Sequence, residues 1–514
     1  MKSSKLTAAD SSMISPPEIE SALVTRVRAA LTEAGGQTEA GGQMQYGYMA
    51  RVSFQDLYAE GKISNCNGNN DSPYFACALP KSPLQPASVL DFIHVPALMP
   101  GQSEQLHTCI HLDTSEAIIL VGKTPPKVDY FSFTVFNVTA HADAPPSILT
   151  DSALNGELLR NKPVEVIMEP GQRRMLFCGM GDPLNLLKIK TIPDESSEAP
   201  FDCEFALVYT SNECVFEEVK QGLKSAGIPE EKINLLVVPQ DIVNVGVARE
   251  SNSFSFALRI SNNTSQELVD YLACPPIQVM RYCSANKNNQ PLPIPVLTPR
   301  GNGQTELSYW RQVQQLRQSI LDAHQADYMA IELTTDIWLN ESYIAMQQGV
   351  DNLGESRDTP YFSTETFTLP DGSFIVAYGV NHFASGKALY SNLVVYGAPL
   401  ENGVISVSNK EFTGSAELYL GDTSAPDLYA WRLGFASSEP IGAENYTTIP
   451  SVAPGETNGK PNRPPYVLKR SDPLYLSFRA YVEKATTVGA AWHELVLDRV
   501  IVFVPREPAA TQQR

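Results

Sequence analysis

The chain has 514 residues, with 38 Lys and Arg against 57 Asp and Glu, and a formal net charge of −19. Because one hydrophobic core stops growing at about 250–300 residues, we expect two or three domains. The negative charge repels phosphate backbones and anionic lipid, so nucleic acid is excluded as an expected partner. The 38 prolines and 32 glycines favour turns and short strands over long helices.

Residues 1–45 are expected to form a disordered start, a helix and a flexible link. Ser15 followed by two prolines predicts the helix start, and Gly35-Gly36 predicts its end. The GGQTEAGGQ stretch that begins there is typical of a flexible linker. We interpret the helix and link as a peripheral arm, a candidate surface for docking or for a homo-oligomer, rather than as part of a core.

No apolar run in the sequence has the length of a signal peptide or of a membrane span. We therefore expect a cytoplasmic protein with no membrane partner. The eight cysteines show no Cys-x-x-Cys spacing, which indicates mostly reduced, buried thiols.

Residues 46–295 are predicted to form a first β domain. Short β-type runs such as AIILVG, YFSFTVFNV, VEVIM and RRMLFCGM are bounded by turn residues, which is typical of an antiparallel sheet. Between residues 203 and 240, two strands flank an amphipathic helix that opens near Asn212. This order predicts one β-α-β unit with a right-handed crossover.

Residues 296–355 are predicted to be a linker and helical segment, which follows the proline-rich stretch 290–304. Thr305 is expected to cap a helix that runs to His324. A helical stripe predicts its core face, made of Leu307, Trp310, Val313, Leu316, Ile320 and Leu321.

Residues 356–514 return to strand-like runs and are predicted to form a second β domain. The expected fold class is mostly β with accessory helices (α+β), built from two antiparallel β-sandwich or jelly-roll-like domains. Asp113-Thr114 and Asp358-Thr359 each lead into paired strands and lie nearly half the chain apart. This similarity suggests duplicated domains, although a chance match of two hairpins explains it too.

The Asp-Thr lead-in, the YFSFTVF run, the Asp371-Gly372 turn and the closing LSFRAY and VIVFVP strands resemble the bacterial domain-of-unknown-function 1254/1214 proteins. The resemblance covers residues 105–140 and 356–505 and implies two packed, jelly-roll-like domains with accessory helices. Ser115 stands where that family usually carries a tyrosine. Since the family has no established chemistry, the resemblance bears on the fold alone.

A first candidate site is a metal centre formed by His107, His111, Asp113 and His141, with Asp143 nearby. On an extended strand, His107, Cys109, His111 and Asp113 all point to one face. On a helix, the two histidines at i and i+4 are also neighbours. Such a face in a β-sandwich suits Fe, Mn or Zn, so a divalent metal is the suggested cofactor. The alternative is a set of ordinary polar residues beside a buried cysteine.

A second candidate is a catalytic hairpin at residues 381–392, which also carries Asn381, Ser385 and Asn392. His382 is a candidate general base, and Lys387 and Tyr390 are candidates to stabilise negative charge. Gly386 allows a close turn, so the hairpin suits the rim of a small-molecule pocket. The alternative is a plain turn with His382 bonded to backbone.

A third candidate consists of carboxylates at helical spacing, with acid–base or metal-binding potential if the helix continues past His324. The alternative is a solvated helix face. The group comprises Glu332, Asp336, Trp338 and Glu341.

The GxSxG, GxxxxGK[ST], GxGxxG and HExxH signatures are absent from the sequence. Classical hydrolase, NTPase, dehydrogenase and zincin mechanisms are therefore not expected. Because a long chain with polar clusters in strand-end loops favours a pocket, the expected function is an enzyme that transforms a small molecule in a β-sandwich pocket. A non-catalytic ligand-binding or scaffold protein and a carbohydrate-binding or carbohydrate-modifying jelly-roll protein are the alternatives.

Overall fold

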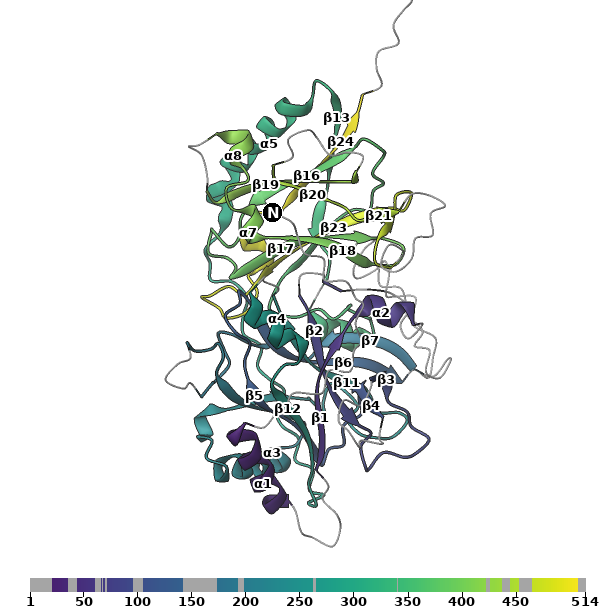
Figure 1. The fold of residues 1–514 in the computed structure, drawn as a ribbon, viewed down its shortest axis with the longest axis vertical. Helices are drawn as coiled ribbons and strands as arrows, with labels where there is room; N and C mark the ends of the chain where they lie inside the picture. Colours follow the sequence, from purple (N-terminus) through teal and green to yellow (C-terminus); the bar gives the residue numbers. More distant parts are fainter. Residues whose placement is uncertain are drawn as a thin grey trace, which may run out of the picture.

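The computed structural model describes residues 21–506, except 36–43, 61–65, 67, 70–71, 96–104, 142–172, 193–197, 262–264, 340, 422–425, 437–443 and 453–464. The fold is mostly β with a few helices, so the predicted α+β class is confirmed. Two halves are stacked along the long axis of the molecule, with the earlier residues in one and the later residues in the other (Figure 1). No described helix has the length and apolar character needed to cross a membrane.

The first half contains a 12-stranded sheet whose main path runs β10-β9-β5-β12-β1-β2-β11-β6-β7. Neighbouring strands on this path are antiparallel except β9 and β10. The strands are β1 (Gln45–Val52), β2 (Tyr74–Pro80), β3 (Phe92–Val95), β4 (Leu106–Cys109), β5 (Glu116–Lys123), β6 (Phe131–His141), β7 (Arg173–Gly179), β8 (Leu184–Asn185), β9 (Glu204–Thr210), β10 (Ile233–Val237), β11 (Ser253–Ile260) and β12 (Ile277–Cys283).

The predicted β-α-β unit is confirmed, because β9 and β10 pair in parallel and α3 (Glu213–Ser225) lies between them in the chain. Asn212 caps this helix: its side chain accepts a hydrogen bond of 3.0 Å from the Cys214 N–H. The cap satisfies an N–H group that has no partner within the helix. The predicted VEVIM strand lies outside the described residues.

Helix α1 (Ala22–Gly35) belongs to the core of the first half. Its apolar side chains Leu23, Val24, Val27 and Leu31 are buried and join a cluster with residues of α3, β5 and β9. Their i, i+1, i+4, i+8 spacing gives the helix one apolar face, which packs against the sheet and α3. The peripheral-arm interpretation is therefore wrong. Ser15 and the glycine-rich link lie outside the described residues.

The second half is a sandwich of two five-stranded sheets, β13-β24-β16-β19-β20 and β14-β15-β23-β17-β18. Apolar residues from both sheets meet in one core. The strands are β13 (Tyr328–Leu333), β14 (Thr335–Ile337), β15 (Tyr361–Thr364), β16 (Phe374–Val380), β17 (Tyr390–Gly397), β18 (Asn402–Ser408), β19 (Leu428–Gly434), β20 (Tyr446–Thr448), β23 (Leu474–Tyr481) and β24 (Arg499–Pro505), with the short pair β21 (Ser451–Val452) and β22 (Leu468–Lys469) beside them.

Helix α5 (Trp310–His324) covers the outer face of the first of these sheets. Val313, Leu316 and Ile320 are buried there against β16 and β24. A short 3-10 helix (Glu306–Tyr309) precedes α5, so the structure divides the single predicted helix into two segments. Thr305 makes no capping hydrogen bond with its side chain, and its predicted cap is wrong.

Shorter helices lie around the junction and on the second half. They are α2 (Phe54–Ala59), α4 (Gln266–Ala273), α6 (Ser342–Gln348), α7 (Asn409–Phe412) and α8 (Glu417–Leu420). The predicted linker region 296–355 is divided between the halves, because α5 packs on the second half and α6 contributes Ala345 and Met346 to the core of the first.

The two Asp-Thr lead-ins occupy different structural positions. Asp113 lies at the turn before β5, where it accepts hydrogen bonds from the backbone and hydroxyl of Ser115 at 2.9 and 2.6 Å. Asp358 is buried between the halves and accepts from Tyr130 at 3.0 Å and from Asn185 at 2.6 Å. The halves also differ in strand order, so the duplication stays a hypothesis from the sequence.

Candidate functional site

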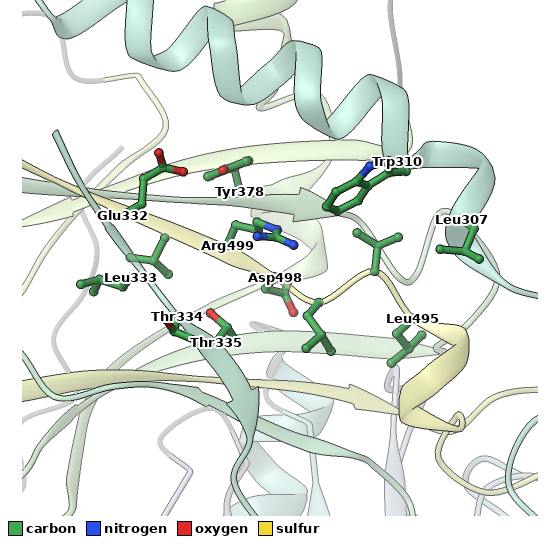
Figure 2. A pocket seen from close by; sticks show the side chains of 13 residues that line it. Leu307, Trp310, Glu332, Leu333, Thr334, Thr335, Tyr378, Leu495, Asp498 and Arg499 are labelled. Carbon is green, nitrogen blue, oxygen red and sulfur yellow. The ribbon is translucent and has the colours of Figure 1, made fainter. Parts of the chain in front are cut away.

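A cavity of about 520 Å³ lies at one side of the second half. Four parts of the chain surround it: the start of the α5 segment, the crossing from β13 to β14, one residue of β16 and the segment leading into β24. Figure 2 shows Trp310 and Leu307 at one end and Glu332 at the other, with Arg499 and Asp498 between them. The lining residues are Leu307, Trp310, Glu332, Leu333, Thr334, Thr335, Tyr378, Leu495, Val496, Leu497, Asp498, Arg499 and Val500.

The apolar wall of this cavity includes two residues that the helical stripe predicted to be core. Leu307 and Trp310 are 67% and 42% exposed instead. Leu307 lies in the 3-10 segment, which has three residues per turn and places its side chains at a different angle from a continuous α-helix. Trp310 is the first residue of α5. The guanidinium of Arg499 lies 5.0 Å from the centre of the Trp310 ring, a cation–π distance.

Asp498 is a buried carboxylate in the wall of the cavity, and two side chains behind it hold it in place. Its Oδ1 accepts a hydrogen bond of 2.6 Å from the Tyr429 hydroxyl, and its Oδ2 lies 3.4 Å from His382 Nε2. The other ring nitrogen of His382, Nδ1, lies 2.9 Å from Glu306 Oε1. Glu306, His382 and Asp498 therefore form a buried chain of three titratable groups that ends at the cavity.

The imidazole of His382 is stabilised as a cation. Burial opposes its charge, but attraction and hydrogen bonding to Glu306 and Asp498 prevail and raise its pKa well above the ordinary value. Burial likewise opposes the charge on Glu306, and the interaction with His382 outweighs it and lowers the Glu306 pKa. A charged imidazole donates from both nitrogens, so His382 has no free lone pair for use as a base.

Lys387 lies in a separate buried cluster. Its Nζ is 2.7 Å from Glu483 Oε1, 2.6 Å from Glu494 Oε2 and 3.1 Å from Asn302 Oδ1. Glu494 also accepts backbone N–H groups of the 302–303 turn. The Lys387 side chain is 6% exposed and its ammonium has three oxygen partners, so it holds a loop in place and does not line the cavity.

Tyr390 lies at the junction of the two halves. Its ring centre is 5.3 Å from that of Tyr481 and 6.3 Å from that of Tyr130. Its hydroxyl accepts a hydrogen bond of 3.0 Å from Asn392. The predicted catalytic residues His382, Lys387 and Tyr390 thus contact three different sets of partners. Their joint catalytic role stays a prediction that the geometry does not favour.

Two of the other polar residues of the hairpin support its local structure. Ser385 donates to Glu306, and Asn381 accepts from the Phe383 N–H at 3.2 Å. Gly386 adopts a φ of +83°, which confirms the predicted turn, because side chains other than glycine are strained there.

Within the described part of the chain, the predicted metal ligands lie in different surroundings. Among the described residues, no group of three or more His, Cys, Asp or Glu side chains is placed to hold a metal ion. Strand β4 ends at Cys109, and the chain beyond it continues as isolated antiparallel bridges at Ile110 and Leu112. His107 lies opposite Leu79 in the β2–β4 pairing, and His141 lies at the end of β6. Asp143 lies outside the described residues.

His111 and Asp113 instead belong to a buried polar network. His111 Nδ1 is 2.8 Å from Asp91 Oδ1, and this interaction outweighs burial and lowers the Asp91 pKa. Next to it, Arg281 pairs with Glu116 at 2.8 Å, and Glu116 accepts the Asp113 N–H at 2.9 Å. Both members of the Arg281–Glu116 pair are fully buried. The network fixes the turn that precedes β5.

The helical spacing predicted for Glu332, Asp336, Trp338 and Glu341 is wrong. The helix ends at His324, and the chain continues as strands β13 and β14. Glu332 forms an exposed ion pair with Arg317, and Trp338 packs in an aromatic cluster. The isoleucine, tyrosine and threonine residues in this segment favour strands through their packing on a pleated surface.

Asp498, Tyr429 and Glu306 were not singled out from the sequence. Asp498 lies 116 residues after His382, and Glu306 lies 76 residues before it. None of the three stands in a recognisable motif. Only the packing of β16, β19 and the strand leading into β24 brings them together.

Comparisons with known proteins identify no family. No protein-family model and no curated protein matches the chain. Among solved structures, an uncharacterised protein from Burkholderia cenocepacia is 12% identical, with 94% of this chain and 87% of that chain covered and a TM-score of 0.36. A protein from Vibrio parahaemolyticus is 9% identical, with 94% and 100% covered and a TM-score of 0.32.

Proposed function

We propose that this protein binds a small organic molecule in the cavity bordered by Trp310 and Asp498. The observation that carries the proposal is a cavity of about 520 Å³ lined by both a partly exposed indole and a buried, oriented carboxylate. Small-molecule sites typically have volumes of about 300–1,000 Å³, apolar walls and a few fixed polar groups. This cavity has all three features.

The lining defines the chemistry of the ligand. Asp498 has acceptor capacity beyond its bonds to Tyr429 and His382, because each carboxylate oxygen has two lone pairs. Arg499 Nε is buried without a hydrogen-bond partner. A suitable ligand has a flat apolar part for Trp310, a donor for Asp498 and an acceptor for Arg499. Amines and amino acids can donate to Asp498, and amino acids also carry an acceptor for Arg499. Sugars have hydroxyl donors and acceptors, and their rings pack on indole faces.

An enzymatic role is the second candidate, and the chain Glu306–His382–Asp498 favours it. In such a role Asp498, not His382, would take a proton from the ligand, because only Asp498 of the three lines the cavity. Both oxygens of Asp498 already accept a hydrogen bond, one from Tyr429 and one from His382, so fewer lone pairs remain to take a proton. We therefore place ligand binding first and acid–base chemistry second.

A panel of amino acids, small amines and monosaccharides tests the proposal by thermal shift and calorimetry. We expect at least one class to bind saturably and to lose most of its affinity in Asp498→Asn and Trp310→Ala. Trp492→Ala is the matched control, because Trp492 is 53% exposed and lies outside the cavity lining. Equal binding by all variants, or no binding in any class, would refute the proposal. Conversion of the bound compound by wild-type protein, lost in Asp498→Asn, would support the enzymatic alternative.

A further inference from the structure

Two arginines from different halves line one small cavity at the junction. Arg259 lies on β11 of the first half and Arg479 on β23 of the second. They are 6% and 5% exposed. The cavity has a volume of about 20 Å³ and is separate from the one at Trp310. Its lining comprises Phe54, Gly68, Asn69, Tyr74, Phe177, Arg259, Trp338, Leu339, Leu353, Gly354, Tyr361 and Arg479.

Neither guanidinium has a carboxylate within ion-pair distance among the described residues. Arg259 donates to the Tyr361 hydroxyl and to the Gly354 carbonyl, both at 3.3 Å. Its Cζ lies 5.0 Å from the centre of the Tyr74 ring. All of these partners are uncharged, so they solvate the cation but do not neutralise it.

Arg479 is surrounded by aromatic rings and is incompletely bonded. Its Nη2 donates to the Tyr396 hydroxyl at 2.8 Å, and its Cζ lies 5.5 Å from the Trp338 ring centre and 5.3 Å from that of Tyr361. Its Nη1 is buried and has no hydrogen-bond partner. Tyr361 connects the two arginines, because its hydroxyl bonds to Arg259 and its ring lies beside Arg479.

Two buried carboxylates of the second half at this junction have other hydrogen-bond partners. Asp358 accepts hydrogen bonds from Tyr130 and Asn185, and Glu355 pairs with Arg300 and accepts the Ser342 N–H at 3.0 Å. Asp358 attracts Arg259 from beyond ion-pair distance, so among the described residues the junction holds two buried cations without a directly paired anion. Buried charges in proteins are normally paired, and an unpaired buried donor is similarly uncommon.

We propose that the cavity at the junction binds the carboxylate group of a small anion, held by Arg479 with Arg259 as the second cation. A planar carboxylate matches the planar, forked donors of a guanidinium and fits between aromatic rings. A cavity of 20 Å³ exceeds the roughly 10–15 Å³ that one water requires, so only a small group fits in it. Because the arginines come from different halves, the anion joins them.

The direct test is thermal unfolding of the full chain in sodium formate or sodium acetate. Formamide and acetamide are the neutral matched controls, and sodium sulfate at the same ionic strength is the control for salt and for a tetrahedral anion. We expect a saturable rise in Tm, on the order of 3 °C, with formate and acetate only. The same rise in sulfate, or no saturable rise in formate, would overturn the proposal.

Variants locate the site. Arg479→Lys keeps a positive charge but loses the forked donors, so we expect formate affinity to fall at least about tenfold. Arg432→Lys is the control, because Arg432 is 7% exposed and lies on β19, outside the cavity lining. Leu339→Phe fills the cavity without altering charge and should also abolish binding. Formate affinity equal to that of the wild type in Arg479→Lys or in Leu339→Phe would contradict the proposed site. If neither variant folds, the formate titration of the wild-type protein tests the proposal alone.

Discussion

The Nδ1 atom of His382 lies 2.9 Å from Glu306 Oε1, which connects the hairpin after β16 to the 3-10 segment before α5. On its other side, His382 faces Asp498, so one imidazole is held between two buried carboxylates. His382 thus positions both the helix that borders the cavity, through Glu306, and Asp498, which lines the cavity. The stability of the protein should therefore depend on the pH and on each of these three residues.

Replacing His382 by Gln should destabilise the protein by about 3–5 kcal/mol near pH 6, because it leaves two buried carboxylates without their cation. The pKa of His382 is raised by folding, so its contribution is complete below about pH 6.5 and disappears as the pH rises through the folded-state pKa. Urea unfolding of both proteins from pH 5.5 to 10 measures the difference. We expect it to shrink at high pH, and a difference that grows with pH would contradict the ion pair.

Lys387→Met should cost about 3 kcal/mol of unfolding free energy, because Glu483 and Glu494 would remain buried without a cation. The double variant Lys387→Met/Glu494→Gln should lose less than the sum of the single variants, since the second change removes one of the stranded charges. Chemical denaturation of the four proteins measures this coupling. Strict additivity would show that the two side chains do not interact.

Val27→Ala should destabilise the protein by about 1–3 kcal/mol, because Val27 is fully buried in the packing of α1 against α3 and the sheet. Thr25→Ala, at an exposed position of the same helix, is the control and should change stability by less than about 0.5 kcal/mol. Light scattering run alongside should give the same molar mass for both. If Val27→Ala instead changed only the molar mass, the helix would be an assembly surface after all.

Gly47→Ala should prevent the native pairing of β1 with β2, because a Cβ atom there would lie 1.8 Å from the Ala78 carbonyl oxygen. We expect a loss of more than about 3 kcal/mol or failure to fold, since backbone atoms have little room to move. Gly379→Ala on β16 is the control, because its Cβ would lie no closer than 3.4 Å to a neighbouring atom, which is an ordinary van der Waals contact. Far-UV circular dichroism and thermal unfolding of both variants measure the result. A Gly47→Ala protein as stable as Gly379→Ala would contradict the prediction.

The sequence by itself determined the local elements that a short pattern can specify. Alternating and continuous apolar runs located β5, β6 and β24, and Asn212 with the following apolar residues located α3 and the β-α-β unit. These features depend on interactions between residues a few positions apart. The fold class follows from their number and order. The sequence did not determine whether His382, Lys387 and Tyr390 act together, because residues that are close in sequence on a turning hairpin can contact different partners.

Only the tertiary structure decided which polar groups meet. Asp498 reaches His382 through strand pairing across the sheet, and Arg259 reaches Tyr361 only because the two halves pack together. The burial of Val27 also depends on a partner helix nearly 190 residues later in the chain. Contacts of this kind are set by how whole sheets and helices pack, and the surrounding sequence carries no periodic signal for them.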